Sequence, residues 1–375
     1  MKRINLVQVG VGLIGGTTIS QVMENRARWR DQLGIDVGIA ALVGSDGAIV
    51  AEDPNGFSDK QLHSILGARK AGASIGRIAA SKQFHAIDGV AAIDDVAAMG
   101  RFVVADSATG NATAAVAARA LKHGGGVVYS NKAPLSLPSG DPAGDAIWAA
   151  AGSNGAVRYE TSCGAGLPVI STLQSLLDTG DEVLEIAGTV SGTFGAIFSD
   201  VAAGKPFSEA VRSAKERGYT EPDPRDDLSG LDVARKALIL ARTIARKVDL
   251  TDIEVESLVP EALRTIEVPE YLERVSEQDA EMAGRAAAAA AEGKTLKYVA
   301  RVRPAGTISI GVRPVATNTV LGALQGPENI ITFRTKRYDI YPMNITGPGA
   351  GAAVTAAGVV ADILALATGP IGARS

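Results

Sequence analysis

The sequence is poor in several kinds of residue, and each scarcity excludes a class of protein. Its single cysteine, Cys163, cannot form an intramolecular disulfide and fits a reducing, cytoplasmic compartment. Lysine and arginine total 37 against 41 acidic residues, which leaves no basic excess for a nucleic-acid or anionic-membrane surface. Aromatic residues make up only 4% of the chain, so we expect a core of alanine, valine, leucine and isoleucine.

Long apolar runs are also missing. The most apolar stretch, 352–367, is too short to span a bilayer comfortably and carries Asp362, which favours a helix packed on a sheet. The N-terminus leads directly into a short apolar strand and shows no signal-peptide pattern. The 375 residues suit two domains. We therefore expect a cytoplasmic protein with neither a membrane nor a nucleic-acid partner.

A glycine-rich turn near the N-terminus carries the first functional signal. Residues 4–9 are predicted to form a buried parallel strand, and a helix is predicted over about 17–28. A strand, a glycine turn and a helix start together form the fingerprint of a dinucleotide site, with the pyrophosphate at the helix N-terminus. A glycine turn with a purely structural role is the alternative. The predicted cofactor-binding residues are Gly10, Gly12, Leu13, Ile14 and Gly15.

The second predicted strand, 38–43, bears on the choice of cofactor. It ends in Gly44, Ser45 and Asp46, and Asp46 is slightly late for the acidic residue that binds the ribose hydroxyls of NAD. No lysine or arginine follows directly to accommodate the extra phosphate of NADP. The cofactor is therefore predicted as NAD or NADP, without a strict preference for NADP.

Two further predicted strands, 101–105 and 126–129, end in polar residues. Ligands bind at the carboxyl ends of strands in open α/β sheets, so Ser107 and Thr109 are candidates for the nicotinamide side of a cofactor site. Capping of the next helix is an equal alternative for these hydroxyls. Lys132 follows the second strand and faces the same predicted crevice, although a lysine there, taken alone, is more often a solvated loop cation.

The segment 218–236 concentrates charge more than any other, with five carboxylates, two arginines and a lysine. Its two prolines argue against a regular helix in the first half, and a helix is predicted from about 229 or 230 to 247. Asp232 and Lys236 share a face of that helix. Because this face lies opposite the apolar one, a surface ion pair worth ~0.3–0.5 kcal/mol competes with a catalytic role.

Six segments in the same order resemble the homoserine dehydrogenase family, and together they cover essentially the whole chain. The resemblance implies reversible hydride transfer between L-homoserine and L-aspartate 4-semialdehyde with NAD(P), in the aspartate-derived pathway to threonine and methionine. The matching segments are GVGLIGG from Gly10, NKAPLS from Asn131, YETSCGAGLPVI from Tyr159, SGTFGAIF from Ser191, GYTEPDPRDDLSGLDVARK from Gly218 and GPGAGAAVTAAGVVADIL from Gly347.

The resemblance also implies roles for individual residues. Lys236 or Lys132 would transfer the proton, Glu221 and Asp232 would hold the substrate's ammonium, and Gly351 would border the cofactor site. A monovalent cation, sodium or potassium, would be bound by one side chain and three backbone carbonyls. A glycine-rich bend that opens the helix after Pro168 is the alternative. The implied cation ligands are Glu160, Cys163, Ala165 and Leu167.

The expected architecture is α/β, a Rossmann-type doubly wound parallel sheet with a second α+β domain that binds the amino-acid substrate and forms a homodimer surface. The expected domains are 1–155, 156–337, and a segment 338–375 that returns to the nucleotide-binding domain. Many bacterial members of the family carry a further regulatory domain beyond this point. The sequence stops here, so we expect a short form without that domain or its feedback by threonine.

Two rival functions remain. An acylating semialdehyde dehydrogenase would need Cys163 as a thiolate and a histidine base, but His63, His85 and His123 lie in settings that suggest no catalytic role. A non-catalytic NAD(P)-sensing module would keep the glycine turn, but it would have no need for the acid-rich segment 218–236.

Overall fold

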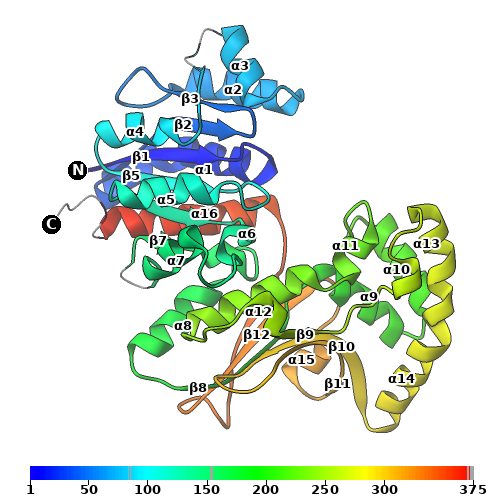
Figure 1. Cartoon of the computed structure of the whole chain (residues 1–375). Coiled ribbons are helices and arrows are strands. Elements are labelled where there is room, and N and C mark those ends of the chain that lie inside the picture. The colour runs from blue at the N-terminus through cyan, green and yellow to red at the C-terminus, as the bar shows by residue number, and fades with distance from the viewer. Residues whose placement is uncertain (83, 85, 153–154, 370, 372–375) are drawn as a thin grey trace. The chain divides into compact units, whose positions relative to one another are not determined.

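The computed structural model describes residues 1–82, 84, 86–152, 155–369 and 371, so His85 lies outside the described residues. The chain forms two compact units, the first from Met1–Gly166 with Gly351–Ser375 and the second from Leu167–Ala350 (Figure 1). The expected boundaries after residues 155 and 337 therefore lie earlier in the sequence than the divisions in the structure. None of the described helices is long and apolar enough to cross a membrane.

The first unit is a Rossmann-type α/β fold, as predicted. Its seven-stranded sheet has the order β4-β3-β2-β1-β5-β6-β7, with β2, β1, β5, β6 and β7 parallel. The strands are β1 Lys2–Val9, β2 Ile35–Gly44, β3 Gly47–Val50, β4 Ala86–Ile87, β5 Phe102–Asp106, β6 Gly126–Tyr129 and β7 Val157–Arg158. The helices are α1 Leu13–Leu33, α2 Asp59–Lys70, α3 Ile75–Lys82, α4 Ala91–Ala98, α5 Ala114–Lys122, α6 Lys132–Leu135, α7 Pro142–Ala149, the 3₁₀ helix η1 Glu160–Ser162, and α16 Ala352–Thr368.

Two features of the first unit, one in its sheet and one in a helix, differ from expectation. The chain reverses after β2 and pairs β3 with it antiparallel, because Gly47, with φ of +136°, closes a tight turn from Gly44. Strand β4 extends this antiparallel edge. Helix α1 begins at Leu13, earlier than the predicted start near residue 17, so the glycine turn passes directly into it.

The core of the first unit is built from both ends of the chain. Ile4 and Leu6 of β1 are fully buried and belong to one apolar cluster with Val359 and Ile363 of α16. The Gln21 side-chain amide also donates to the Ala353 carbonyl at 2.9 Å, which joins α1 to α16. The apolar stretch predicted to pack on a sheet therefore completes the first unit.

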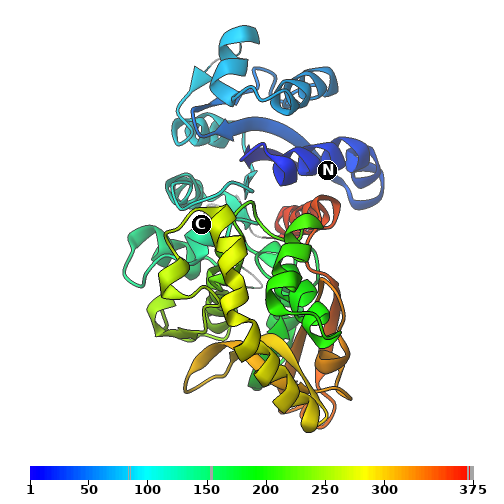
Figure 2. The same cartoon turned by 90° about the vertical axis from the view of Figure 1, so that its right-hand side faces the viewer.

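The second unit is an α+β fold around a six-stranded sheet of order β13-β12-β8-β10-β11-β9, in which only β9 and β11 pair parallel among the described pairs. Helices α9, α10 and α14 contact one another beside it (Figure 2). Its strands are β8 Val183–Thr189, β9 Ile253–Val255, β10 Lys294–Val302, β11 Ile308–Ala316, β12 Glu328–Thr335 and β13 Met343–Pro348. Its helices are α8 Val169–Asp178, α9 Gly192–Ala202, α10 Phe207–Glu216, α11 Pro224–Leu228, α12 Leu231–Thr243, α13 Val268–Arg274, α14 Asp279–Ala291 and α15 Val320–Ala323, with 3₁₀ helices η2 Leu250–Asp252, η3 Glu261–Leu263 and η4 Val275–Gln278.

Three local expectations for this unit were wrong. Pro224 begins the short helix α11, since proline at the first helical position lacks only an N–H that would have no helical partner. Helix α12 ends at Thr243 and not near 247, and Ala245 adopts φ of +62°. The alternating pattern of 295–302 and 307–312 predicts a hairpin with one covered face. The hairpin forms, but residues 296–300 of β10 are all buried because α9, α12 and α14 pack against the strand.

Candidate active site

The glycine turn of the first unit has the geometry that its sequence predicts. Gly10 has φ of +77°, and a Cβ atom there would meet the Ala108 backbone nitrogen at 2.6 Å. A Cβ at Gly15 would lie 1.9 Å from the Gly10 carbonyl oxygen. A Cβ at Gly12 would meet nothing within 4 Å. Gly10 and Gly15 are therefore required by packing, whereas Gly12 leaves open space at the start of α1, where unpaired N–H groups favour an anion.

The turn after β5 is fixed by a buried carboxylate. Asp106 is 2% exposed, and it accepts hydrogen bonds from the Thr113 hydroxyl at 2.5 Å and the Ala108 N–H at 3.0 Å. Burial raises the pKa of this carboxyl above its ordinary value. The Ser107 hydroxyl beside it is buried and has no hydrogen-bond partner among the described residues. A bound ligand could supply the hydrogen-bond partner that this hydroxyl lacks.

Helix α6 places Lys132 at the end of the neighbouring strand, β6. Asn131 caps this short helix by accepting the Ala133 N–H at 3.1 Å. Lys132, the first residue of α6, is half-buried. Neither Ser107 nor Thr109 caps α5, whose cap residue is Thr113 and makes no capping bond through its side chain. The structure therefore gives no support to the capping alternative for these two hydroxyls.

Arg69 was missed by the sequence analysis. It comes from α2, and its Nε donates to the Val11 carbonyl inside the glycine turn at 3.1 Å. Its charge also reaches Asp46, whose pKa is lowered first by a hydrogen bond from Ser74 and in smaller part by this guanidinium. A basic residue thus stands near the end of β2 after all. No local signal could identify it, because β3 and most of α2 separate it from that strand.

The turn predicted to hold a cation is buried and strained. Glu160 is 8% exposed, and its backbone N–H donates to Asp362 of α16 at 2.9 Å. Burial, with a smaller contribution from the nearby Glu160 charge, raises the pKa of Asp362 to about 7. Ala165 adopts φ of +53°, which is rare for a residue with a side chain and costs on the order of 1 kcal/mol or more. A carboxylate and backbone carbonyls are suitable donors for a hard cation.

The acid-rich segment of the second unit lines a cavity of about 580 Å³. Lys236 is only 8% exposed, so the surface-pair interpretation of this residue was wrong. Its ammonium donates to the Val190 carbonyl at 2.6 Å and pairs with Asp232 at 2.8 Å. The start of α9, the start of β12 and the end of β13 complete the lining. Its members are Ser191, Gly192, Thr193, Gly218, Tyr219, Thr220, Glu221, Asp227, Asp232, Lys236, Pro327, Glu328, Gly347, Pro348, Gly349 and Ala350.

The carboxylates of this segment have separate tasks. Asp227 accepts the Glu221 N–H at 2.8 Å and the Thr193 hydroxyl at 2.9 Å, so it fixes the backbone that carries Glu221. Burial raises the pKa of Asp227. Asp223 instead holds Arg225 through two oxygens, and Asp226 is exposed. The structure thus brings the predicted residues Lys236, Glu221 and Asp232 to one cavity and adds Asp227 to them.

The remaining predicted residues belong to the first unit. The glycine turn, Ser107, Thr109 and Lys132 lie at the carboxyl ends of its parallel strands. Gly351 begins α16 and directly follows Ala350, the last residue of the cavity lining. Of the implied cation ligands, Glu160, Cys163 and Ala165 fall in the first unit, whereas Leu167 begins the second.

Comparison with known proteins identifies the family. The sequence model of homoserine dehydrogenase matches residues 168–364, more than half of the chain. The chain belongs to the homoserine dehydrogenase family. It is 36% identical over 369 residues to the chloroplastic bifunctional aspartokinase/homoserine dehydrogenase 2 of Arabidopsis thaliana, covering 96% of this chain and 38% of that protein. It is 42% identical over 222 residues to the homoserine dehydrogenase of Saccharomyces cerevisiae, covering 57% of this chain and 62% of that one.

Solved structures share the fold of this homoserine dehydrogenase family member. A Candida auris protein of unknown function superimposes with a TM-score of 0.81 at 29% identity, covering 98% of this chain and 99% of that chain. A hyperthermophilic archaeal homoserine dehydrogenase in complex with NADPH gives a TM-score of 0.71 at 21% identity, covering 99% of both chains. The chain spans less than half the length of the bifunctional plant relatives.

The comparisons give no support to either rival function, and the surroundings of Cys163 argue against an acylating dehydrogenase. The Cys163 side chain is fully buried, whereas a nucleophilic thiolate needs access to substrate. His63 contacts the Asp59 carbonyl on its own helix, and His123 pairs with Asp94. Both histidines are therefore engaged with residues other than Cys163.

Proposed function

We propose that this chain interconverts L-homoserine and L-aspartate 4-semialdehyde by hydride transfer to or from NADP or NAD. The observation that carries the proposal is the buried ammonium of Lys236, paired with the half-exposed Asp232 in a cavity that Glu221 also lines. Holding an ammonium and two carboxylates in one partly buried cavity is costly for a stable fold unless a charged substrate uses them.

Lys236 is suited to transfer the proton. Its ammonium is fixed by Val190 and Asp232, so it has one orientation in the cavity wall. When the aldehyde is reduced, the carbonyl oxygen becomes an alkoxide, and a positioned ammonium can protonate it as the charge develops. In the reverse direction the neutral amine accepts the hydroxyl proton. We assign this role to Lys236 and place Lys132 on the nicotinamide side.

The carboxylates give the site its specificity. Glu221 and Asp232 can hold the substrate's ammonium group by charge-assisted hydrogen bonds, which disfavours aldehydes that lack the amine. Asp227 holds the backbone of Glu221 in place through the 2.8 Å hydrogen bond. The substrate's amine is thereby positioned before the hydride moves, and positioning supplies a large part of the rate.

The first unit would bind the nicotinamide cofactor, which supplies the hydride chemistry when it is bound. Gly10, Gly12, Leu13, Ile14 and Gly15 would hold the pyrophosphate at the start of α1. Ser107 and Thr109 would line the nicotinamide side together with Lys132, and Gly351 would border the site. The unsatisfied Ser107 hydroxyl and the open space at Gly12 support this assignment, as does the NADPH complex of the archaeal homoserine dehydrogenase.

We also propose that a monovalent cation, sodium or potassium, binds at the turn of residues 160–167. The Glu160 carboxylate and the carbonyls of Cys163, Ala165 and Leu167 would be its ligands. The left-handed backbone at Ala165 supports this assignment, because such strain commonly accompanies a functional turn. The protein is further proposed to act in the cytoplasm as a homodimer whose surface lies in the second unit, within threonine and methionine biosynthesis.

The test is the initial rate at the nicotinamide absorbance band with L-homoserine and NAD or NADP in parallel. The wild type should turn over, and Lys236→Met should lose about 100-fold or more in kcat. Lys247→Met is the control, because Lys247 is exposed just beyond α12. Circular dichroism establishes that each variant is folded. A folded wild type that binds cofactor but never oxidises homoserine would contradict the proposal, and so would a Lys236→Met variant with an unchanged rate.

A further inference from the structure

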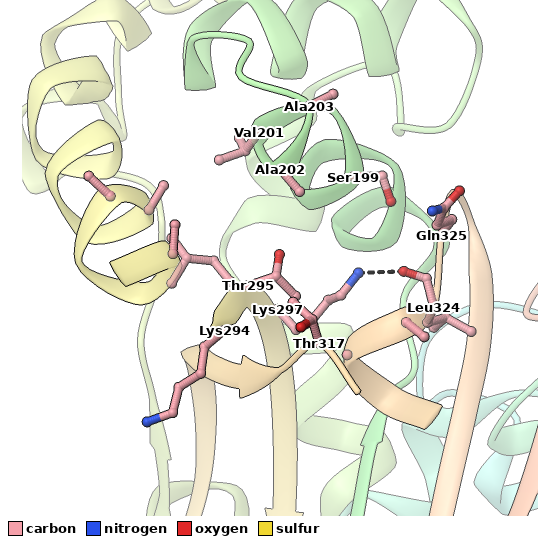
Figure 3. A pocket seen from close by; sticks show the side chains of 16 residues that line it. Ser199, Val201, Ala202, Ala203, Lys294, Thr295, Lys297, Thr317, Leu324 and Gln325 are labelled. Carbon is pink, nitrogen blue, oxygen red and sulfur yellow. Dashed lines mark hydrogen bonds between the residues drawn. The ribbon is translucent and has the colours of Figure 1, made fainter. Parts of the chain in front are cut away.

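A second cavity, of about 790 Å³, lies in the second unit and shares no lining residue with the cavity of Lys236. Its volume is within the range typical of small-molecule sites. Helices α9 and α14, strand β10 and the segment before β12 surround it (Figure 3). Neither the family comparison nor the proposed reaction assigns a function to this cavity.

Lys297 is the unusual residue of this cavity. It is 5% exposed in a strand whose neighbours, Leu296 and Tyr298, are apolar and buried. Its ammonium donates one hydrogen bond, to the Leu324 carbonyl at 2.5 Å (Figure 3). Among the residues that the structure describes, no carboxylate forms an ion pair with it, and burial alone lowers its pKa. Lysines are almost never this buried unless they are paired.

An ammonium has three donors, and Lys297 uses one of them within the described part of the chain. The charge also lacks an anion, which makes its burial costly. A bound anion would remove both deficits. The nearby Lys294 gives the opposite case, because it lies at the cavity's edge with its charge already paired to Glu292 at 2.6 Å.

The other lining residues define the kind of anion. Polar side chains line the cavity together with Lys297, and small apolar side chains line the rest of it. One unpaired ammonium matches a single negative charge, whereas a phosphate dianion would require more donors than this. The polar members are Ser199, Thr295, Thr317 and Gln325, and the small apolar members are Ala202, Ala286, Ala287 and Ala290.

We propose that this cavity binds a small organic carboxylate with a short apolar body, whose carboxylate group accepts hydrogen bonds from Lys297. The alanines of α9 and α14 contact the apolar part of the ligand. The ligand is a monoanion of a few carbon atoms. This site is independent of homoserine oxidation, and its occupancy is measured without homoserine or a nicotinamide cofactor.

The experiment titrates the full chain with butyrate, with the uncharged butyramide and with inorganic phosphate, near neutral pH, by isothermal calorimetry and ligand-observed NMR. Butyrate should bind in the millimolar range, and butyramide and phosphate at least about tenfold more weakly. Lys297→Met should weaken butyrate binding about tenfold or more, because a charge-assisted hydrogen bond is lost. Lys294→Met should leave it within about twofold, since that charge is paired at the surface.

Lys297→Gln serves as a second variant, and circular dichroism reports the folding of each. Removing a buried unpaired charge does not threaten the fold, so folded protein is expected from both. The proposal is overturned if the folded wild type shows no butyrate binding up to about 100 mM. Equal binding of butyrate and butyramide, or unchanged butyrate binding by both Lys297 variants, would also overturn it.

Discussion

Asn131 donates a hydrogen bond from its side-chain amide to the buried carboxylate of Asp106 at 3.2 Å. The same amide reaches the Gly110 carbonyl at 2.7 Å, and the Asp106 backbone carbonyl accepts the Asn131 N–H at 3.1 Å. These bonds fasten the turn after β5 to the start of α6, where Lys132 lies. The two loops at the carboxyl ends of neighbouring strands are therefore held as one body.

Asp106→Asn should change how stability depends on pH. Burial raises the pKa of Asp106 in the folded protein, so the folded state binds a proton more readily than the unfolded chain. The stabilising contribution of protonation is fully present below the unfolded pKa of about 3.9 and is lost as pH rises through the folded pKa. The free energy of unfolding of the wild type, minus that of the D106N variant, should fall as pH increases.

Urea unfolding of both proteins over a series of acidic to neutral pH values measures this difference. A difference that stays constant with pH would show that the carboxyl is not perturbed. One that grows with pH would show that the Thr113 and Asn131 hydrogen bonds outweigh burial and lower the pKa.

Gly15→Ala and Gly12→Ala should separate folding from cofactor binding. The added methyl at Gly15 would lie 1.9 Å from the Gly10 carbonyl oxygen, so α1 must shift, and we expect a loss of about 3 kcal/mol in unfolding free energy. The methyl at Gly12 meets nothing within 4 Å. Gly12→Ala should keep its thermal stability and yet bind NADPH weakly by fluorescence titration. Wild-type NADPH affinity in the Gly12→Ala variant would show that the pyrophosphate does not bind at this turn.

Arg69→Met should alter cofactor preference. The guanidinium lies beside the glycine turn and near Asp46, at the end of β2, where the extra phosphate of NADP is recognised in this fold. The ratio of kcat/KM for NADP to that for NAD should fall about tenfold or more on loss of this charged donor. Lys70→Met, the exposed neighbour, is the control. An equal fall with both cofactors would instead mean that Arg69 serves only to hold the Val11 carbonyl.

Asp227→Asn should impair catalysis more than stability. The amide oxygen can still accept the Glu221 N–H, and the amide N–H can donate to the Thr193 hydroxyl, which donates to the Tyr219 carbonyl. Neither bond to residue 227 is then charge-assisted, so the loop carrying Glu221 loosens. We expect a loss of about 1 kcal/mol in stability and about tenfold in kcat/KM for homoserine. Asp226→Asn, at an exposed position in the same segment, should behave as wild type. Equal effects of the two substitutions would contradict the separate role of Asp227.

Much of the fold could be predicted from local pattern. Strand β6 begins and ends where the sequence predicted, because a short apolar run between polar turns has few alternative structures. The run of alanines predicts a helix around 279–291, and α14 has these bounds, since alanine favours helix at every position. Strand β3 was missed because the residues after Gly44 were interpreted only as a possible ribose contact, while the conformation of Gly47 turns the chain back.

The site residues that could not be predicted depend on tertiary contacts. A helical wheel places Lys236 opposite the apolar face, and only the Val190 carbonyl and the adjoining loops bury it. Arg69 is separated from the glycine turn by α1, β2, β3 and most of α2, so no spacing rule connects them. Asp227 resembles its neighbour Asp226 in sequence, and the hydrogen bond from Thr193 of α9 distinguishes the two.

The contribution of α16 to the core of the first unit has a consequence for the order in which the chain folds during synthesis. The second unit is continuous from Leu167 to Ala350 and can complete its core as soon as it has left the ribosome. The first unit contains β1 yet must wait for Val359, Ile363 and Leu366, which are synthesised after the whole of the second unit. Its strands therefore remain partly uncovered until the second unit has been synthesised, and the contacts that cover them join residues on either side of that unit. A premature stop codon just before α16 would leave the first unit without part of its core, whereas the second unit would be complete.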